Sequence, residues 1–162
     1  MVLAFDVGTS SLRTALFDSR ARRIVPTTAQ QAYRLLVTAD GGAEHAAAVL
    51  EKAARSCLQQ TLRRYRSYRG LRARRIVAVG ASCFWHSLLG VSETGAALTP
   101  VYTWADSRCR ADARRLREEF SEKLIQRRTG CMLRSSFWPA KLVWLRRTQP
   151  RLFAQVARWM SQ

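Results

Sequence analysis

The first segment of the sequence that could do chemistry combines an acid, a glycine, three hydroxyls and an arginine. Asp6 ends a short apolar run, Gly8 allows a tight turn, and Arg13 follows the turn. The hydroxyl residues between them are Thr9, Ser10 and Ser11. Turn amides and hydroxyls can hold phosphate oxygens, arginine can neutralise them, and one carboxylate can hold hydrated Mg²⁺. The pattern indicates a phosphate site, although an ordinary hairpin turn would have the same residues, and no P-loop sequence G-x-x-x-x-G-K-[ST] occurs.

Two later segments could bind the hydroxyls of a sugar. Trp85 and His86 follow an apolar run, and such a pair can stack on a sugar face and hydrogen-bond its hydroxyls. A core tryptophan beside a hydrogen-bonded histidine is the alternative. Asp106 could also bind substrate hydroxyls, but it could equally help to cap the helix that we expect to start beside it.

The elements that must position these residues begin with strands. Apolar residues and an alternation of period two predict three consecutive strands with short turns, which form an antiparallel meander. A later continuous apolar run, Ile76–Ala81, predicts a central strand that is covered on both faces, and Leu88–Val91 predicts another short strand. The four main strands are expected near residues 2–6, 11–17, 23–33 and 76–82.

Helical spacing of apolar residues predicts the remaining elements. The two long helices are expected near residues 43–64 and 107–127. Ser107 could cap the second of them, and Gly130 follows its end. Two shorter helices are expected over Lys141–Arg147 and Arg151–Trp159, each close behind a proline. These elements predict a mixed α/β layer structure in which a meander leads into a covered sheet.

Length and composition indicate a globular chain. It has 162 residues, of which 48% are hydrophobic and 24% charged, which suits one domain with a core that needs no disulfide or metal. No apolar run approaches the ~18 residues of a membrane span, and the opening segment lacks the basic start of a signal peptide. The four cysteines form no C-x-x-C pair and there are only two histidines, which argues against a zinc site. We therefore expect a cytoplasmic protein with reduced thiols and no membrane partner.

The net charge of +17 raises a second hypothesis, a nucleic-acid-binding protein. Its best feature is Arg63–Arg75, where seven arginines and two tyrosines occur without an acid. A solvated helix end and loop would have the same composition, and arginines occur along the whole chain, which favours incidental charge. A ribonuclease-H-like nuclease needs several acids around two metal ions, and only Asp6 is suitably placed.

Together, the candidate segments resemble the N-terminal part of the FGGY family of carbohydrate kinases, which includes gluconate, xylulose and glycerol kinases. Leu3–Ser11 resembles the first phosphate motif, and Val79–His86 resembles the substrate strand, where relatives often carry Gln-Met-His. Trp85–Gly90 and Ser135–Lys141 look most like bacterial gluconokinase-like members. The segments that resemble the family's G-x-x-L-x-P … W-x-D-x-R and T-G … K-L-x-W-L stretches are Gly95–Pro100, Trp104–Arg108, Thr129–Gly130 and Lys141–Leu145.

The resemblance implies a ribonuclease-H-like fold, as in actin, Hsp70 and sugar kinases: an α/β structure with a mixed sheet in β-β-β-α-β-α order. It implies phosphoryl transfer from ATP, with Mg²⁺, to a hydroxyl of a sugar or sugar acid, with gluconate favoured. By position, Asp6 matches the metal-associated acid, which would hold Mg²⁺ through water, and Arg13 matches a basic residue near the transferred phosphate. Gly8, Thr9, Ser10 and Ser11 match the phosphate turn, and Trp85, His86 and Asp106 match substrate-binding positions.

The sequence also departs from the family pattern. Family members are two-domain enzymes, and residues 1–162 correspond to an incomplete N-terminal, sugar-binding domain without the C-terminal ATP-binding domain. No candidate for the general-base aspartate of the family's G-x-x-D-like segment occurs after Asp112. We therefore expect no catalytic base in this chain and no sugar turnover by the chain alone. We also expect an uncovered apolar surface that associates with the missing domain or with a second copy.

Overall fold

A computed structural model describes all residues, 1–162, and the chain forms two compact units. Unit 1 comprises Met1–Arg34 and Ala48–Phe84, and unit 2 comprises Leu35–Ala47 and Trp85–Gln162. Each unit has its own sheet and its own cluster of buried apolar side chains, so each is described by itself.

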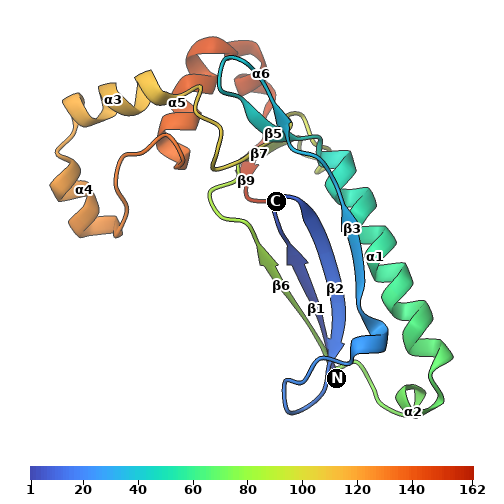
Figure 1. Cartoon of the computed structure of the whole chain (residues 1–162). Helices are drawn as coiled ribbons and strands as arrows, with labels where there is room; N and C mark the ends of the chain where they lie inside the picture. Colours follow the sequence, from blue (N-terminus) through green and yellow to red (C-terminus); the bar gives the residue numbers. More distant parts are fainter. The chain divides into compact units, whose positions relative to one another are not determined.

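Unit 1 is built around a mixed four-stranded sheet (Figure 1). Its strands are β1 (Val2–Val7), β2 (Ser11–Phe17), β3 (Ala29–Ala32) and β6 (Ala78–Cys83), in the spatial order β3-β2-β1-β6. β1 pairs antiparallel with β2 and parallel with β6, and β2 pairs antiparallel with β3. The predicted meander and mixed sheet are confirmed. The third strand is shorter than expected because a 3₁₀ turn with a proline at its start, η1 (Val25–Thr27), precedes it.

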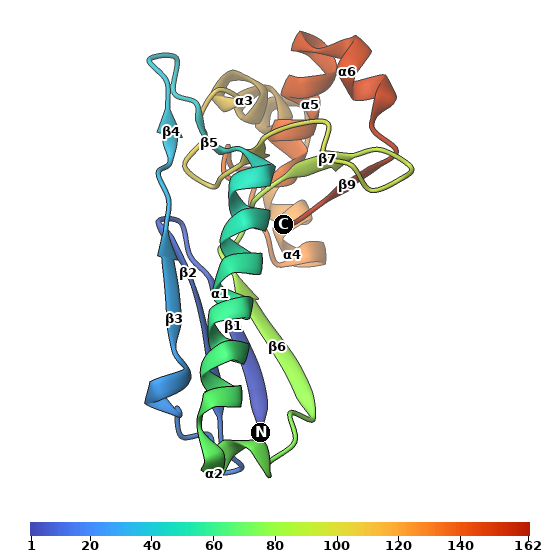
Figure 2. The same cartoon turned by 90° about the vertical axis from the view of Figure 1, so that its right-hand side faces the viewer.

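The long helix α1 (Ala47–Ser67) covers one face of this sheet (Figure 2). Its buried residues recur at helical spacing and form one stripe; they are Leu50, Ala53, Cys57 and Thr61. This stripe packs against Leu12 of β2 and Ala29 of β3. The helix begins later than predicted because Ala43–His45 form a strand of unit 2. A short helix, α2 (Arg69–Arg72), follows α1 and precedes β6.

Strand β6 corrects the expectation of a central strand covered on both faces. It lies at the edge of the sheet and pairs only with β1, and Val77 and Val79 are 74% and 64% exposed. The reason is visible in Figure 2, where α1 runs over β1 and β2 and no helix of unit 1 lies over β6. A continuous apolar run shows that a strand is suited to burial on both faces, but it cannot show which covering elements are present.

Unit 2 combines small sheets with four helices. A three-stranded antiparallel sheet has the order β4-β5-β8, and β7 pairs antiparallel with β9. The strands are β4 (Leu36–Val37), β5 (Ala43–His45), β7 (Leu89–Val91), β8 (Val101–Tyr102) and β9 (Arg158–Met160). The helices are α3 (Arg110–Glu119), α4 (Glu122–Thr129), α5 (Trp138–Thr148) and α6 (Pro150–Gln155).

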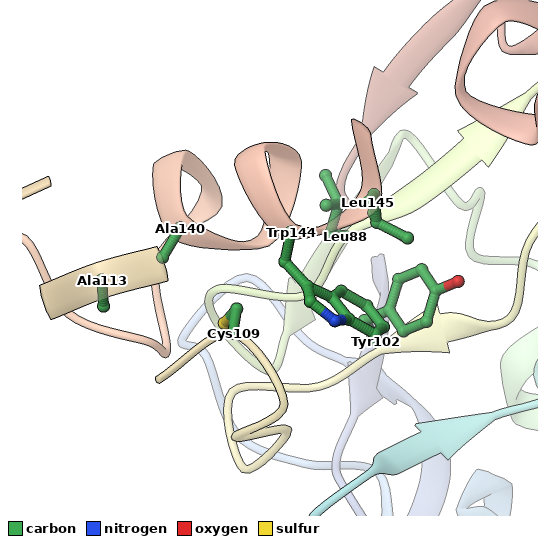
Figure 3. Close-up of a cluster of buried hydrophobic side chains, with 7 residues drawn as sticks. All are labelled: Leu88, Tyr102, Cys109, Ala113, Ala140, Trp144 and Leu145. Carbon is green, nitrogen blue, oxygen red and sulfur yellow. The ribbon is translucent and has the colours of Figure 1, made fainter. Parts of the chain in front are cut away.

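The core of unit 2 forms where α5 packs against β8 and α3 (Figure 3). Trp144 of α5 lies edge-on to Tyr102 of β8, with ring centroids 5.8 Å apart. The buried set is Leu88, Tyr102, Cys109, Ala113, Ala140, Trp144 and Leu145. The four cysteines are all free thiols. None of the helices combines the length and the apolar character needed to cross a membrane.

The single helix predicted over residues 107–127 is two helices. Phe120 has an extended backbone (φ −121°, ψ 143°) that separates α3 from α4. Ser121 then caps α4 by accepting a hydrogen bond from the Leu124 N–H. Gly130 ends α4 in the left-handed conformation (φ 76°), which agrees with its predicted place after the helix.

Two other predicted helix ends are wrong. Ser107 does not cap α3; the N-cap is Cys109, and the Ser107 hydroxyl donates to the Gly41 carbonyl instead. The helix expected over residues 151–159 ends at Gln155, because residues 158–160 pair with β7 as strand β9. In both places a contact between distant segments of the chain overrides the local pattern.

Candidate functional site

The turn between β1 and β2 places the predicted phosphate-binding residues at one end of the unit 1 sheet. Antiparallel pairing sets Asp6 of β1 opposite Arg13 of β2. The Gly8 N–H donates to the Ser11 carbonyl at 2.9 Å and closes the turn. A Cβ at position 8 would lie 3.1 Å from that carbonyl oxygen, so the turn has little room for a larger residue.

Side chains from β3 and the segment after it hold this turn in place. The Tyr33 hydroxyl donates to the Gly8 carbonyl at 2.5 Å, and the Tyr33 N–H donates to the Ser10 carbonyl at 3.0 Å. Burial raises the pKa of Tyr33 to about 12, so the phenol stays protonated as a donor. Gln30 Nε2 donates to the Ser11 hydroxyl at 3.2 Å, and Ser11 is 5% exposed. The Ser11 side chain therefore supports the turn rather than facing solvent.

Asp6 and Arg13 form an ion pair that is open to solvent. Arg13 Nη1 lies 3.0 Å from Asp6 Oδ2, and both side chains are about half exposed. With Arg23 they line a hollow of about 270 Å³. Because exposed ion pairs contribute little to stability, either partner can exchange the other for a ligand at small cost. The guanidinium is suited to phosphate oxygens, which it can bind in bidentate fashion.

A magnesium ion fits this end of the sheet in the company of phosphate groups. Mg²⁺ usually keeps several waters and is held by one or two carboxylates together with substrate phosphates. Asp6 supplies one exposed carboxylate. No group of three or more His, Cys, Asp or Glu side chains could hold a metal ion by itself. Asp6 therefore suits a hydrated ion that arrives with a phosphate ligand, rather than a resident metal.

In unit 2, Trp85 and His86 line an apolar pocket of about 420 Å³. The other walls come from α4, the segment that follows it and the start of α5; they are Ile125, Thr129, Cys131, Met132, Leu133, Phe137, Trp138 and Pro139. Trp138 Nε1 donates to the Ser87 carbonyl at 2.8 Å and so ties α5 to the segment that carries Trp85 and His86. No lysine, arginine, aspartate or glutamate lines the pocket. Such a lining suits a neutral ligand that presents an apolar face.

His86 is a polar residue of this pocket, and its backbone geometry is unusual. Its φ of 62° lies in the left-handed region, which residues other than glycine adopt rarely. Its ring lies edge-on to Phe137, with centroids 4.2 Å apart, and edge-on to Trp85 at 5.7 Å. Burial lowers the pKa of His86 and the charge of Lys141 lowers it further, so the imidazole is neutral at pH 7. A neutral imidazole can donate one hydrogen bond to a hydroxyl and accept another.

Asp106 lies in a buried network of unit 2. Its side chain is 1% exposed, and it pairs with Arg108, whose Nη2 lies 2.5 Å from Asp106 Oδ2. The same guanidinium lies 2.5 Å from Glu44 Oε2 and 4.8 Å from the centroid of the Trp144 ring. Asp106 also accepts from the Ala43 N–H at 3.2 Å. Burial alone would lower the pKa of Arg108, but its hydrogen bonds to the two acids outweigh burial and raise it.

These contacts give Asp106 a positioning role within unit 2. Its carboxylate joins the Arg108 segment to β5, and it does not cap α3, whose N-cap is Cys109. Because the carboxylate already has protein partners, direct contact with a substrate stays a prediction.

Lys141 fixes the backbone beside Asp106. The side chain is 1% exposed, and its Nζ donates to the carbonyls of Asp106 and Ser135, each at 2.9 Å. Cys109 Sγ donates to the same Ser135 carbonyl at 3.1 Å. Burial lowers the pKa of Lys141, and the nearby charge of Asp106 only partly opposes this effect. Lys141 therefore connects the Asp106 segment to the segment that leads into the pocket wall.

The structure thus arranges the predicted site residues in three groups. The first consists of Asp6, the turn 8–11 and Arg13 in unit 1, the second of Trp85 and His86 in the pocket of unit 2, and the third of Asp106 in the buried network of unit 2. The expectation that the first group shares a cleft with the others stays a prediction, because it belongs to a different unit.

Sequence reasoning missed most walls of the pocket. Met132, Phe137 and Trp138 are apolar, and apolar residues have the same pattern whether they fill a core or line a pocket. The available signal was the resemblance of Ser135–Lys141 to gluconokinase-like proteins, which marks the segment without giving its residues a role.

Comparison with known proteins settles the family. Residues 1–162 match the N-terminal domain of the FGGY family of carbohydrate kinases. The chain belongs to this family. Among its relatives, the glycerol kinase of Leptothrix cholodnii is 32% identical over 158 residues, which are 97% of this chain and 31% of the relative. The glycerol kinase of Polaromonas sp. is 30% identical over 163 residues, with the same two coverages. The chain thus spans about 31% of the length of these relatives.

Solved structures agree with the family fold. The xylulose kinase from Rhodospirillum rubrum matches with a TM-score of 0.88 at 24% identity, over 99% of this chain and 32% of that one. The gluconate kinase from Lactobacillus acidophilus matches with a TM-score of 0.84 at 24% identity, over 99% and 31%. The predicted α/β sugar-kinase fold with a mixed sheet is therefore confirmed. FGGY carbohydrate kinases are phosphotransferases with an alcohol acceptor, and the family match gives no support to a nucleic-acid-binding function.

Proposed function

We propose that this chain forms the acceptor-binding part of a carbohydrate kinase. In the complete enzyme, the terminal phosphoryl group of ATP would pass to a hydroxyl of a sugar, a polyol or a sugar acid. Gluconate is the acceptor that the sequence resemblance favours. The observation that carries this proposal is the pocket of unit 2, where a neutral imidazole stands among aromatic rings. We further propose that the protein acts in the cytoplasm, where its four free cysteines stay reduced.

The pocket supplies the two kinds of contact that a sugar needs. The exposed face of Trp85 and the rings of Phe137 and Trp138 can cover the C–H face of an acceptor. His86 can hydrogen-bond a hydroxyl as donor and acceptor and so orient it. Because the pocket lining holds no cation, the carboxylate of gluconate would have to lie outside the pocket. Neutral acceptors such as glycerol and xylulose need no such partner.

The β1–β2 turn would serve the nucleotide. The backbone amides and hydroxyls of Thr9 and Ser10 can bind phosphate oxygens, whereas the buried Ser11 side chain supports the turn, and Arg13 can release Asp6 to bind phosphate as well. When bound beside Asp6, Mg²⁺ would neutralise charge on the phosphates. The fixed turn lowers the cost of ordering this segment around a ligand.

None of the candidate site residues is placed to act as the general base of the phosphoryl transfer. Asp106 is buried and paired with Arg108, and Asp6 is suited to phosphate and metal. A positioned base typically contributes ~10²–10⁴-fold to rate. We therefore propose that the chain alone binds an acceptor without phosphorylating it at a kinase-like rate.

Acceptor binding by the purified chain tests this proposal. Glycerol, xylulose and gluconate would be titrated separately, with binding followed by saturation-transfer NMR of the ligand. At least one acceptor should bind, and Trp85→Ala and His86→Ala should each weaken it by about tenfold, the equivalent of one good contact of about 1.4 kcal/mol. Phe120→Ala is the matched control, because this exposed aromatic of unit 2 lies outside the pocket. Equal losses in all three variants, or no binding of any acceptor, would count against the proposal.

A further inference from the structure

The arginine-rich end of unit 1 has no part in the proposed kinase chemistry. The start of β1, the hairpin after β2 and the loop from α2 to β6 lie at the same end of the unit (Figure 1). Asp6 and its turn lie at the other end of β1, and a strand of this length spans roughly 15–20 Å. A ligand at the arginine-rich end is therefore separate from the turn of residues 8–11.

A polar hollow of about 470 Å³ opens at this end. Ser19, Arg20 and Arg22 of the hairpin form one wall, and Arg74 and Arg75 of the loop before β6 form another. The ion pairs of the structure include neither Arg20, Arg74 nor Arg75. Two separate segments thus bring arginines without a carboxylate partner to the hollow.

The one acid that lines this hollow, Asp18, is already hydrogen-bonded within its own hairpin. Asp18 Oδ1 accepts from the N–H groups of Arg20 and Arg22, each at 2.9 Å, and Oδ2 accepts from Arg22 Nε at 3.0 Å. The hydrogen bond from the Arg22 N–H lowers the pKa of Asp18 most, so the carboxylate stays charged within this arrangement. It neutralises Arg22 and leaves the other three arginines unbalanced.

Backbone hydrogen bonds fix the loop that carries the second wall. The Arg74 N–H donates to the Leu71 carbonyl at 2.9 Å, and the Tyr65 hydroxyl of α1 donates to the Arg74 carbonyl at 3.1 Å. The Val77 N–H donates to the Met1 carbonyl at 2.9 Å where β6 joins the sheet. On the loop itself these bonds use main-chain atoms only, so they fix its backbone without occupying the guanidinium groups of Arg74 and Arg75.

We propose that this hollow is a binding site for a small polyphosphate, a ligand with phosphate groups at both ends. Arginine binds phosphate oxygens through two parallel N–H···O bonds, which match a phosphate group better than a point charge does. The hairpin wall would hold one end through Arg20 and Ser19, and the loop wall would hold the other through Arg74 and Arg75. The volume of about 470 Å³ lies within the range of small-ligand sites.

A small ligand fits the structure better than a nucleic acid strand. Two arginines of the basic segment bind carbonyl groups of the chain itself: Arg64 donates to the Thr28 carbonyl, and Arg72 donates to the Arg66 carbonyl. The unpaired arginines of the hollow come from two separate loops and do not form a stripe along one helix. A long strand needs such a stripe, together with aromatic rings on which bases stack, and no aromatic residue lines the hollow.

The test is a calorimetric titration of the purified chain with sodium tripolyphosphate in the absence of Mg²⁺. The variant Arg74→Gln/Arg75→Gln should bind about 100-fold more weakly, because each charged hydrogen-bonding group contributes about a factor of ten. Arg20→Gln should weaken binding by about tenfold through the other wall. The control Arg114→Gln/Arg115→Gln removes the same charge from exposed positions of α3 that do not line the hollow, and it should change the affinity by less than about threefold because solvent screens exposed charges. Inorganic phosphate should bind more weakly than tripolyphosphate, because it can reach only one wall.

Equal losses in the two double variants would show that net charge alone attracts the anion, and would overturn the proposal. So would an absence of tripolyphosphate binding. Tighter binding of a mixed-sequence RNA oligonucleotide than of tripolyphosphate, lost in Arg74→Gln/Arg75→Gln, would also overturn it, in favour of a nucleic acid surface. The fold is not at stake in these variants because the side chains of Arg74 and Arg75 make no ion pair, and circular dichroism checks it directly.

Discussion

Replacing Arg108 by methionine should destabilise unit 2 severely. The guanidinium lies 2.5 Å from both Glu44 and Asp106, whose side chains are 17% and 1% exposed. Removing it leaves Asp106 as a buried charge without a cation, and breaking a buried pair in this way costs about 3–5 kcal/mol. The cation–π contact of Arg108 with the Trp144 ring is worth about 0.5–2 kcal/mol. This contribution is not simply added to the cost of breaking the ion pair, because the two interactions share one side chain and methionine keeps part of the packing.

The assay is urea unfolding, followed by circular dichroism, of the purified chain and its variants. Arg108→Met should lower the free energy of unfolding by about 3–5 kcal/mol without a large change in the dependence on urea. Adding Asp106→Asn should restore part of the loss, because the unpaired charge is then gone. Arg55→Met is the control: its ion pair with Glu51 is exposed, so the change should stay within about 1 kcal/mol. A loss below about 1 kcal/mol for Arg108→Met would refute the role given to this network.

Three further predictions concern other parts of the chain. Burial raises the pKa of Tyr102 from 10.0 to about 12, so the folded chain keeps a proton that the unfolded chain releases between these pH values. The contribution of the Tyr102 phenol to the free energy of unfolding is complete below pH 10 and declines as the pH approaches 12. Urea unfolding across this pH range should show a smaller decline in stability for Tyr102→Phe than for the unchanged chain. An equal decline would contradict the raised pKa of Tyr102. Val79→Lys should reduce self-association at the uncovered strand β6, measured by sedimentation velocity, whereas Val49→Lys on α1 should not; equal behaviour of the two would show that β6 is not the contact. Leu145→Ala should cost about 2–5 kcal/mol in thermal or urea unfolding because the side chain is 1% exposed in the core, and a loss below about 1 kcal/mol would show that this core is loosely packed.

The parts of unit 1 that sequence predicts well are those that local patterns determine. Alternation over Ser11–Phe17 and the apolar stripe of α1 each reflect a face that is buried; β2 has its expected bounds, and α1 covers most of its expected range although it begins later, at Ala47. The exposure of Val79 on β6 could not be predicted, because burial of a strand depends on which elements cover it. The break at Phe120 in the second long helix left no proline or glycine signal in the sequence.

The candidate site also contains residues that local sequence patterns reveal and residues that they do not. The turn at Gly8 and the pair Trp85–His86 could be found because polar and aromatic residues directly follow strands or apolar runs. The pocket walls such as Phe137 could not be distinguished from core residues. The partner of Asp106 stands two residues away at Arg108, where the sequence could have suggested an ion pair, whereas Glu44 reaches the same guanidinium through a long-range contact that no local pattern records.

Phosphorylation of an acceptor by ATP is the measurement that tests the central claim most directly. It would be run with Mg²⁺ on a panel of glycerol, xylulose and gluconate, using both the 162-residue chain and the complete open reading frame in which its sequence occurs. The account predicts ATP-dependent phosphorylation of at least one acceptor by the product of the complete reading frame, loss of this activity in His86→Ala and Asp6→Ala, and no comparable turnover by the chain alone. Phosphorylation that is unchanged in both variants, or none of any acceptor by the complete product, would contradict it.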